Sequence, residues 1–443
     1  MKLVSTLILL FFTLLISAQT HQKIYDMIDA VSAERIKNDI ETLVNFGTRN
    51  TFSDTLSNTR GIGAARRWIK LQFETISNNC NDCIEVFYQK DFVTKEGNHR
   101  VPHDAWIVNV IAIQKGTKYP NSYIIISGDI DSRASNTMDF KTDAPGANDN
   151  ASGMAGTIEA ARVLSNYKFE HNIVYVGLSG EEQGLFGGQG LAHYAKNHNW
   201  TILGVLNNDM IGNIQGVDGV IDNRSFRIFS EPVPANEPEE TRKLRRFYGG
   251  EVDGNSRQLA RYIHKTTNTY MPEMNPKMIY RLDRFGRGGH HRPFNDLGYP
   301  AVRIMETHEN YIRQHQDVRE EHGVKYGDVL EHVNFEYTKK LTAVNTISLV
   351  SLASAPPPPE NVAIGGIVEP SVKLQWDQVD GAKGYKIYWR DTTSATWDYS
   401  RYVGDVSKFT LEGIVIDNYF FGVSSVSEDG FESMVVFPNS IIR

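Results

Sequence analysis

Two periodicities divide the chain into a long first part and a short last part. Residues 25–77 carry apolar side chains at the three- and four-residue spacing of amphipathic helices. Short apolar runs then alternate with helical stretches, of which the alanine-rich segment 152–164 is the clearest. This alternation predicts an α/β fold in which a sheet has helices on both faces. The strands expected at its centre are residues 123–126, 173–176, 202–206 and 301–305.

The pattern changes near residue 355. Residues 356–359 are all proline, which predicts a stiff, extended linker. After them, apolar and polar residues alternate with period two, which predicts short strands in an all-β sandwich. This part resembles a fibronectin type III domain, with Trp376 on an early strand and Tyr419 at the tyrosine-corner position. The expected boundaries are 19–354 for the α/β domain, 355–359 for the linker and 360–443 for the sandwich.

The first 18 residues have the composition of a targeting segment. Lys2 precedes a mainly apolar run at residues 3–16, and small residues lie just before the polar Gln19. We therefore predict a secretory signal peptide at residues 1–18, which is too short to span a bilayer. No later stretch is apolar over about 18 residues, so we expect a secreted or periplasmic protein without a membrane partner.

Charge and cysteine content narrow the picture. The 443 residues include 46 Lys and Arg against 53 Asp and Glu, and the net charge of −7 argues against nucleic acid as a partner. The two cysteines, Cys80 and Cys83, form a C-x-x-C pair. Outside the cytoplasm such a pair is a short-loop disulfide, a redox motif or part of a metal site. The polar surroundings and the lack of further cysteines favour a structural disulfide.

Acidic residues or histidines follow all four expected central strands. The acidic residues at these strand ends are Asp129, then Glu181 and Glu182, then Asp209, and a histidine-containing segment follows the last strand. Asp149 lies just before the helix expected at 152–164. Each residue alone is more often a solvated loop residue or a helix cap. Together, at the carboxyl ends of strands where α/β proteins bind ligands, they predict a hydrolytic metal site.

Two sequence strings carry a specific resemblance. APGANDNASG at residues 144–153 and GLSGEEQGLFGG at residues 177–188, in this order, resemble the secreted zinc aminopeptidase family with two co-catalytic metals. Relatives of that family include glutamate carboxypeptidase, glutaminyl cyclase and the transferrin receptor. The resemblance covers residues 25–350 and implies a three-layer, zinc-peptidase-like fold.

The resemblance also implies a role for each site residue. Asp149 matches the carboxylate that bridges the metals, and Glu181 matches the general base. The other implied ligands are Glu182 for the first metal, Asp209 for the second, and a closing histidine for which we favour His315 over His308. Asp131 and His291, the latter in the segment GGHHRPFNDLGYPAVR, are expected to lie behind the ligands and orient them.

One departure from the family changes the expected metal content. The family has a histidine ligand in a His-x-Asp motif, but Asp129 stands at that position here. The second metal position, formed by Asp129, Asp149 and Asp209, is then all oxygen and favours zinc less strongly over harder cations. We expect two divalent cations, a tightly held zinc ion beside Glu182 and His315 and a weaker, exchangeable second ion that need not be zinc.

These residues predict a secreted metal-dependent aminopeptidase that releases N-terminal residues from peptides. The metal would activate a water molecule, and Glu181 would accept the proton of that water and return it to the leaving amine. The alternatives are a carboxypeptidase or glutaminyl cyclase on the same fold, or an inactive receptor or adhesion protein. Peptides are the expected substrates, and the C-terminal sandwich is a candidate docking module for a protein or a glycan.

Overall fold

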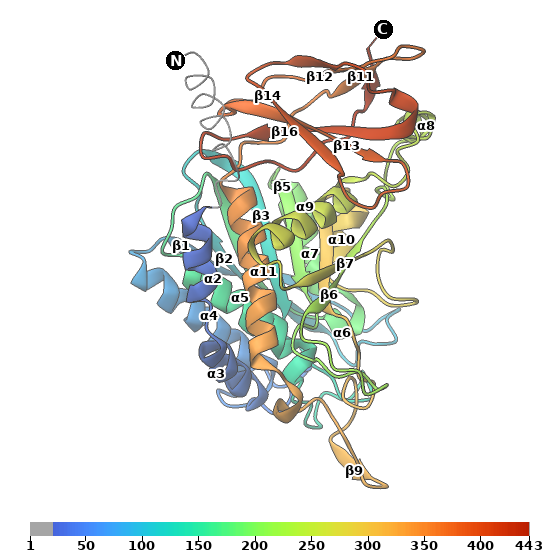
Figure 1. Ribbon diagram of the computed structural model, residues 1–443. Coiled ribbons are helices and arrows are strands. Elements are labelled where there is room, and N and C mark those ends of the chain that lie inside the picture. Colours follow the sequence, from blue (N-terminus) through green and yellow to red (C-terminus); the bar gives the residue numbers. More distant parts are fainter. Residues whose placement is uncertain (1–20, 443) are drawn as a thin grey trace, which may run out of the picture.

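The computed structural model describes residues 21–442 and shows an α/β domain with a smaller all-β unit stacked on one end (Figure 1). The signal peptide predicted at 1–18 lies outside the described residues. Among the helices within 21–442, none combines the length and the apolar composition needed to cross a bilayer.

Eight strands form the central sheet, in the order β1-β2-β4-β3-β5-β8-β6-β7. The middle four are parallel and include the four predicted strands, whereas β2 and β6 beside them run antiparallel. The outer strands β1, β2, β6 and β7 were not among those predicted. The strand bounds are β1 Ile84–Val93, β2 Ala105–Gln114, β3 Tyr119–Asp129, β4 His171–Leu178, β5 Thr201–Asn208, β6 Ser225–Ser230, β7 Asn275–Ile279 and β8 Ala301–Glu306.

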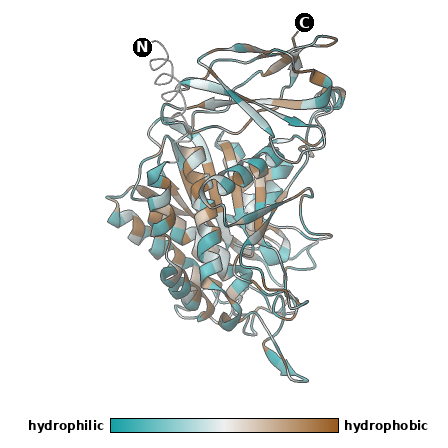
Figure 2. Cartoon of the chain, in the orientation of Figure 1, coloured by the Kyte–Doolittle hydropathy of each residue, from teal (hydrophilic) through white to brown (hydrophobic). Residues whose placement is uncertain are grey.

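Helices cover both faces of the sheet, which confirms the predicted α/β class. Successive strand residues alternate between two hydrophobic cores, so that Ile124 and Ile126 pack on one side and Ile125 on the other. Figure 2 shows brown and white positions on the central strands and teal positions on the outward faces of helices. The helices of the first face are α2 Gln22–Ala30, α3 Ala33–Val44, α4 Gly61–Asn79, α5 Gly153–Leu164, α9 Asn255–Tyr270 and α11 Phe335–Ala353, and those of the second face are α7 Phe186–Asn197 and α10 His291–Asp296.

Shorter elements connect these layers. The loops contain the kinked turn η1 Ala147–Ser152, the turn η2 Leu330–His332, the one-turn helix α6 Glu181–Gly184 and the surface helix α8 Glu239–Phe247. A hairpin of β9 Arg319–Glu321 and β10 Val324–Tyr326 projects from the end of the molecule opposite the all-β unit (Figure 1).

Residues 363–441 form the C-terminal sandwich, which has two sheets in the orders β15-β12-β11-β17 and β14-β13-β16. Trp376 and Tyr385 are buried between the sheets, and the half-buried ring of Tyr419 packs edge-on against Phe421. The bounds are β11 Ala363–Gly365, β12 Val372–Gln375, β13 Gly384–Asp391, β14 Tyr399–Gly404, β15 Lys408–Leu411, η3 Ile416–Asn418, β16 Tyr419–Val426 and β17 Ser440–Ile441.

The C-terminal sandwich packs against the amino ends of the parallel strands. Tyr119, the first residue of β3, donates its hydroxyl to the carbonyl of Asp380 at 2.9 Å. His171, the first residue of β4, places Nε2 at 2.9 Å from the carbonyl of Ala355. The sandwich therefore lies at the sheet edge opposite to the carboxyl ends of these strands.

Buried ion pairs hold the two units together. Asp253 pairs with Arg261 of α9 at 2.7 Å and with Arg390 of β13 at 2.8 Å, and all three side chains are buried. Close by, Lys265 of α9 lies 2.7 Å from Glu432 of the C-terminal sandwich. Because Asp253, Arg261 and Arg390 come from both units and are shielded from water, their pairing gives the sandwich a defined orientation on the α/β domain.

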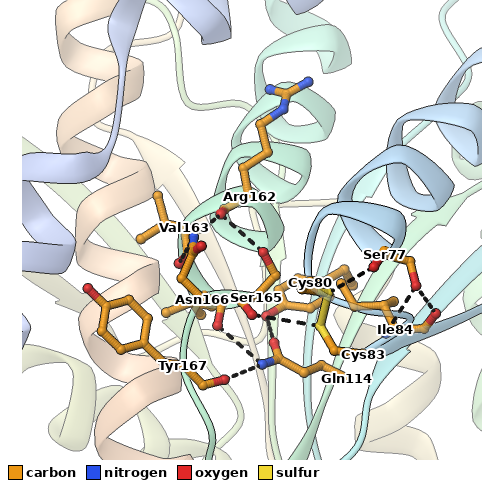
Figure 3. The surroundings of a disulfide bond; sticks show 12 residues. Ser77, Cys80, Cys83, Ile84, Gln114, Arg162, Val163, Ser165, Asn166 and Tyr167 are labelled. Atoms are coloured by element: carbon orange, nitrogen blue, oxygen red, sulfur yellow. Dashed lines mark hydrogen bonds between the residues drawn. A yellow bond between two sulfur atoms is a disulfide. The ribbon is translucent and has the colours of Figure 1, made fainter.

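A disulfide joins Cys80 and Cys83 in the turn between α4 and β1 (Figure 3). The Ser77 hydroxyl closes the same turn, donating to the carbonyl of Ile84 at 2.6 Å and accepting from its N–H at 3.2 Å. The start of β1 pairs with the end of β2, which in turn pairs with the start of β4. The disulfide therefore also lies at the sheet edge that carries the C-terminal sandwich.

Candidate active site

The predicted site residues meet at the carboxyl ends of the four parallel strands. Asp129 is the last residue of β3, Asp209 directly follows β5, and Glu181 opens α6 after β4. Asp149 comes from η1, and His315 comes from the segment after β8. Parallel strands bring their carboxyl ends to one edge of the sheet, which is why residues from distant parts of the chain converge here.

Asp149, Glu182 and His315 form a compact group of metal-binding atoms. His315 Nε2 lies 2.9 Å from Asp149 Oδ2 and 3.4 Å from Glu182 Oε1, and the three ligand atoms are all within 4.8 Å of one another. Atoms bound tetrahedrally to zinc at about 2.0–2.1 Å lie roughly 3.4 Å apart, which matches the distance between His315 Nε2 and Glu182 Oε1. Two carboxylates and one imidazole also leave the fourth position open, as in catalytic zinc sites.

The protonation of His315 and that of its carboxylate neighbours influence one another. Burial alone would lower the pKa of His315, but Glu182 and Asp149 raise it to about 9. Burial would raise the pKa of Asp149, but His315 holds it below the usual range. Gln314 Nε2 donates to Asp149 Oδ2 at 3.2 Å, and the Asp149 N–H donates to Asp328 Oδ2 at 2.6 Å. The bond from Gln314 orients a carboxylate that is held in its charged form, and the bond to Asp328 fixes the backbone of Asp149.

Glu181 lies next to the group of Asp149, Glu182 and His315 but is not one of its three members. The N–H groups of Glu181 and Glu182 each donate to a carboxylate oxygen of Asp131 at 3.2 Å, which fixes the turn that carries both side chains. Burial, reinforced by the charge of Asp209, raises the pKa of Glu181 well above its ordinary value. A carboxyl group with a raised pKa is suited to proton exchange near neutral pH.

Asp129 is buried, and both of its carboxylate oxygens have partners within the chain. Oδ1 lies 2.6 Å from His290 Nδ1, and Oδ2 accepts a hydrogen bond from Asn150 Nδ2 at 2.7 Å. Burial raises the pKa of Asp129 to about 8 and lowers the pKa of His290 to about 4. His291, the predicted neighbour of the site, instead places Nε2 at 2.8 Å from the carbonyl of Leu282. His290 is thus the histidine that contacts Asp129.

Asp209 forms an ion pair with Arg303 of β8. Arg303 Nη2 lies 2.8 Å from Asp209 Oδ2, Nη1 lies 3.2 Å from Asp283 Oδ2, and the three side chains are at most 3% exposed. Arg303 Nε also donates to the backbone carbonyl of Asp209 at 2.5 Å. Burial would lower the pKa of Arg303, but Asp209 and Asp283 raise it above the usual range. Arg303 therefore places a permanent positive charge next to Asp209, the carboxylate that was expected to bind the second cation.

The side chains at the second metal position do not fit a second cation. Within residues 21–442, the group with metal-binding geometry is Asp149, Glu182 and His315. Asp129 is bound by His290 and Asn150, and Asp209 is bound by Arg303. A cation would have to displace these buried partners.

A cleft of about 310 Å³ opens beside the group of Asp149, Glu182 and His315. Glu181, Glu182 and His315 line one part of its wall. The alternative histidine, His308, lies elsewhere, with Nε2 at 3.8 Å from Asp222 Oδ2. The cleft therefore gives a substrate access to Glu181 and to two of the three clustered ligand residues, Glu182 and His315.

Several contributing residues were missed by sequence reasoning. Arg303 lies within a strand predicted as buried core, and a lone arginine in such a strand was a usable signal. His290 is adjacent to the predicted His291, and the choice between them depended on the path of the loop before α10. Asn150 and Gln314 carried no signal of their own beyond being next to Asp149 and His315.

Comparison with known proteins assigns the chain to a family. Residues 109–328 match the sequence profile of Peptidase family M28. A probable zinc metalloprotease of Pyrenophora tritici-repentis is 36% identical over 422 residues, which cover 94% of this chain and 97% of that protein. A probable zinc metalloprotease of Leptosphaeria maculans is 38% identical over 427 residues, covering 96% and 98%. The chain belongs to Peptidase family M28, a family of zinc metallopeptidases.

Solved structures show the same fold. The Legionella pneumophila LapA aminopeptidase has a TM-score of 0.55 at 17% identity and covers 76% of each chain. LapB of the same organism has a TM-score of 0.51 at 17% identity and covers 74% of each chain. At these identities the likeness concerns the α/β fold, the central sheet with helices on both faces.

Proposed function

We propose that this chain is a zinc-dependent exopeptidase, and specifically an aminopeptidase that removes N-terminal residues from peptides. The proposal rests on the group of Asp149, Glu182 and His315, which lies beside Glu181 at the wall of the cleft. A zinc ion held by this group would acidify a water molecule and polarise a peptide carbonyl. An inactive receptor or adhesion protein would need neither the ligand set nor the adjacent carboxyl group.

The residues of the chain take the remaining roles. Glu181 accepts the proton of the attacking water and returns it to the leaving amine. Asp131 is a positioning residue, because it holds the backbone of both Glu181 and Glu182. Gln314 orients Asp149 through its hydrogen bond.

We propose one zinc ion in place of the two cations predicted from the sequence. Arg303 supplies a buried positive charge next to Asp209, and His290 and Asn150 bind Asp129. With these partners, Asp129 and Asp209 stabilise the strand ends without a metal ion. Asp149 would then be a terminal ligand and would not bridge two metals.

The wider organisation is part of the same proposal. Residues 1–18 would direct export, 19–354 would form the peptidase domain, 355–359 the linker, and 360–443 a fibronectin type III-like domain. The C-terminal sandwich lies at the sheet edge opposite to the cleft, which supports docking of a protein or glycan and not catalysis as its role.

Glu181→Gln tests the assignment of the proton carrier. We expect peptide hydrolysis to fall by about 10²- to 10⁴-fold, because the amide cannot carry the proton. Zinc content should stay at the wild-type level, because Glu181 lies outside the group of ligand atoms. Initial rates and metal analysis on the same samples measure both, and Glu240→Gln on the exposed helix α8 is the matched control. Loss of zinc together with activity would make Glu181 a ligand and contradict its role as base.

The type of exopeptidase is tested with aminoacyl, N-blocked and C-terminally amidated peptides, with and without a chelator. An aminopeptidase requires a free N-terminus, so N-blocking should stop cleavage. Cleavage that survives N-blocking would favour a carboxypeptidase, and cyclisation of N-terminal glutamine would favour a glutaminyl cyclase. If the chelator has no effect on any activity, the zinc-dependent function is wrong.

A further inference from the structure

The cleft beside the proposed zinc ligands is rich in positive charge. Its wall includes four arginines from three segments of the chain, Arg100, Arg133, and the neighbouring pair Arg287 and Arg292. The carboxylates in the same wall are Glu181 and Glu182. Since Glu182 is one of the proposed zinc ligands, four guanidinium groups face a single remaining carboxyl group, that of Glu181.

Two of these arginines are already engaged near the ligands. Arg133 Nη1 lies 3.8 Å from Glu182 Oε2. Arg287 Nη2 lies 3.4 Å from His315 Nδ1, and its Nη1 lies 3.9 Å from Glu309 Oε2. Their guanidinium groups add positive charge close to the reacting position, and this charge is only partly compensated.

The other two arginines have no carboxylate partner within residues 21–442. Arg100 lies on an exposed segment at the mouth of the cleft. Arg292 donates from Nη1 to the carbonyl of Arg287 at 3.4 Å, and its Nε is buried without a hydrogen-bond partner. A buried guanidinium N–H without a partner is costly, and a ligand that accepts a hydrogen bond would remove this cost.

Guanidinium groups are the preferred donors to carboxylates, because their planar N–H groups bind two oxygens at once. A cleft of about 310 Å³ has the size of a small ligand site and accommodates an amino-acid side chain or a terminal residue. We propose that this cleft binds a carboxylate of the peptide next to the scissile bond. The source is either an aspartate or glutamate side chain or a free C-terminal carboxylate. This inference rests on the proposed exopeptidase function and specifies its substrate class.

Paired substrates that differ only in charge test the proposal. Comparing peptides with a terminal Glu or Asp with those that have Gln or Asn at the same position tests whether the cleft binds a side-chain carboxylate. Free acids against amides of otherwise identical peptides examine the C-terminal carboxylate. We expect kcat/KM to be at least about tenfold higher for the charged member of one of these two sets, the gain of a hydrogen bond to a charged group.

Arg292→Gln and Arg100→Gln should each lower kcat/KM for the charged substrate by at least about tenfold more than for its neutral partner, with the loss expressed mainly as a higher KM. Neither residue contacts a proposed zinc ligand. Arg401→Gln on the exposed strand β14 of the C-terminal sandwich is the matched control and should change neither substrate. Circular dichroism of each variant checks folding, and the exposure of Arg100 makes that variant the safer of the two.

Equal chelator-sensitive cleavage of charged and neutral substrates would overturn the carboxylate site and leave the exopeptidase function intact. Absence of any chelator-sensitive cleavage would instead overturn the proposed function. In that case, calorimetric titration of the wild type and Arg292→Gln still decides the inference, because binding needs no turnover. The probes are N-acetylglutamate α-amide, which has only the side-chain carboxylate, N-acetylglutamine, which has only the α-carboxylate, and N-acetylglutamine α-amide, which has neither. Tighter binding of either acid than of the neutral amide, lost in Arg292→Gln, supports the inference, and equal binding of all three refutes it.

Discussion

Arg303→Met tests whether a guanidinium takes the place of a second cation. The change removes a positive charge that lies 2.8 Å from Asp209 and 3.2 Å from Asp283, and keeps a long apolar side chain in the core. Removing one partner from a buried ion pair costs about 3–5 kcal/mol, because the remaining charge is buried without compensation. Here two carboxylates lose their partner, so we expect a cost at the upper end of this range.

The informative measurement is the response to added divalent cation. Once Arg303 is absent, Asp209 is free to bind a metal ion together with Asp149, and saturation at 100 times the dissociation constant would restore about 2.7 kcal/mol. Denaturant unfolding with stepwise addition of zinc or manganese measures this stabilisation, and metal analysis after dialysis counts the ions. The wild type should gain stability from one equivalent only, and Arg303→Met should gain from a second.

Two controls separate charge from packing. Arg257 is equally buried, but its donors bind Ser230 at 2.7 and 2.9 Å, so Arg257→Met should cost about 1–3 kcal/mol with no response to a second equivalent. Arg303→Lys keeps a positive charge and should retain the single-ion behaviour. Two equally tight ions in the dialysed wild type would refute the single-zinc proposal. An Arg303→Met variant as stable as the wild type would refute the proposal as well.

Two further predictions concern regions away from the cleft. Replacing both Cys80 and Cys83 by serine should lower stability by about 2 kcal/mol, the loop entropy of so short a bridge, and leave peptide hydrolysis unchanged; an unchanged urea midpoint or a loss of activity would contradict this. Burial alone would raise the pKa of Glu432, but the charges of Lys265 and Lys386 outweigh this effect and lower the pKa from 4.5 to about 2. The stabilising effect of the Glu432 carboxylate is therefore complete above pH 4.5 and is lost as the pH falls towards 2. Glu432→Gln should therefore cost about 2–3 kcal/mol at pH 7 and almost nothing near pH 2, and an unfolding cost that does not vary with pH would count against the interface ion pair.

Local sequence patterns were sufficient for the class of fold and for the central strands of its sheet. Mainly apolar runs predicted the central strands β3, β4, β5 and β8, because strands buried on both faces are rich in apolar side chains, although β8 also contains the buried Arg303. The outer strands were missed. β1 alternates buried and exposed residues irregularly, so its pattern is weaker than that of a central strand. β6 and β7 are only five or six residues long and give little periodicity to detect.

The composition of the candidate site was also largely present in the sequence. Asp129 ends one parallel strand, Glu181 and Asp209 follow two others, and the carboxyl ends of such strands meet at one edge whatever the details of packing. The residue types at that edge, carboxylates with one histidine, therefore followed from their positions at the ends of the predicted strands. Their roles were implied by the resemblance to a family of zinc peptidases.

Only the tertiary structure decided which of these groups act together. Arg303 reaches Asp209 because β8 lies beside β5 in the sheet, and this neighbour relation is a matter of register between segments far apart in the chain. The contact of His290 with Asp129, and the convergence of four arginines on one cleft, depend in the same way on the paths of loops. Sequence alone determined which chemical groups lie at the strand ends. Three-dimensional packing determined their partners, because the energies of buried charges depend on distances of a few ångströms that no local pattern encodes.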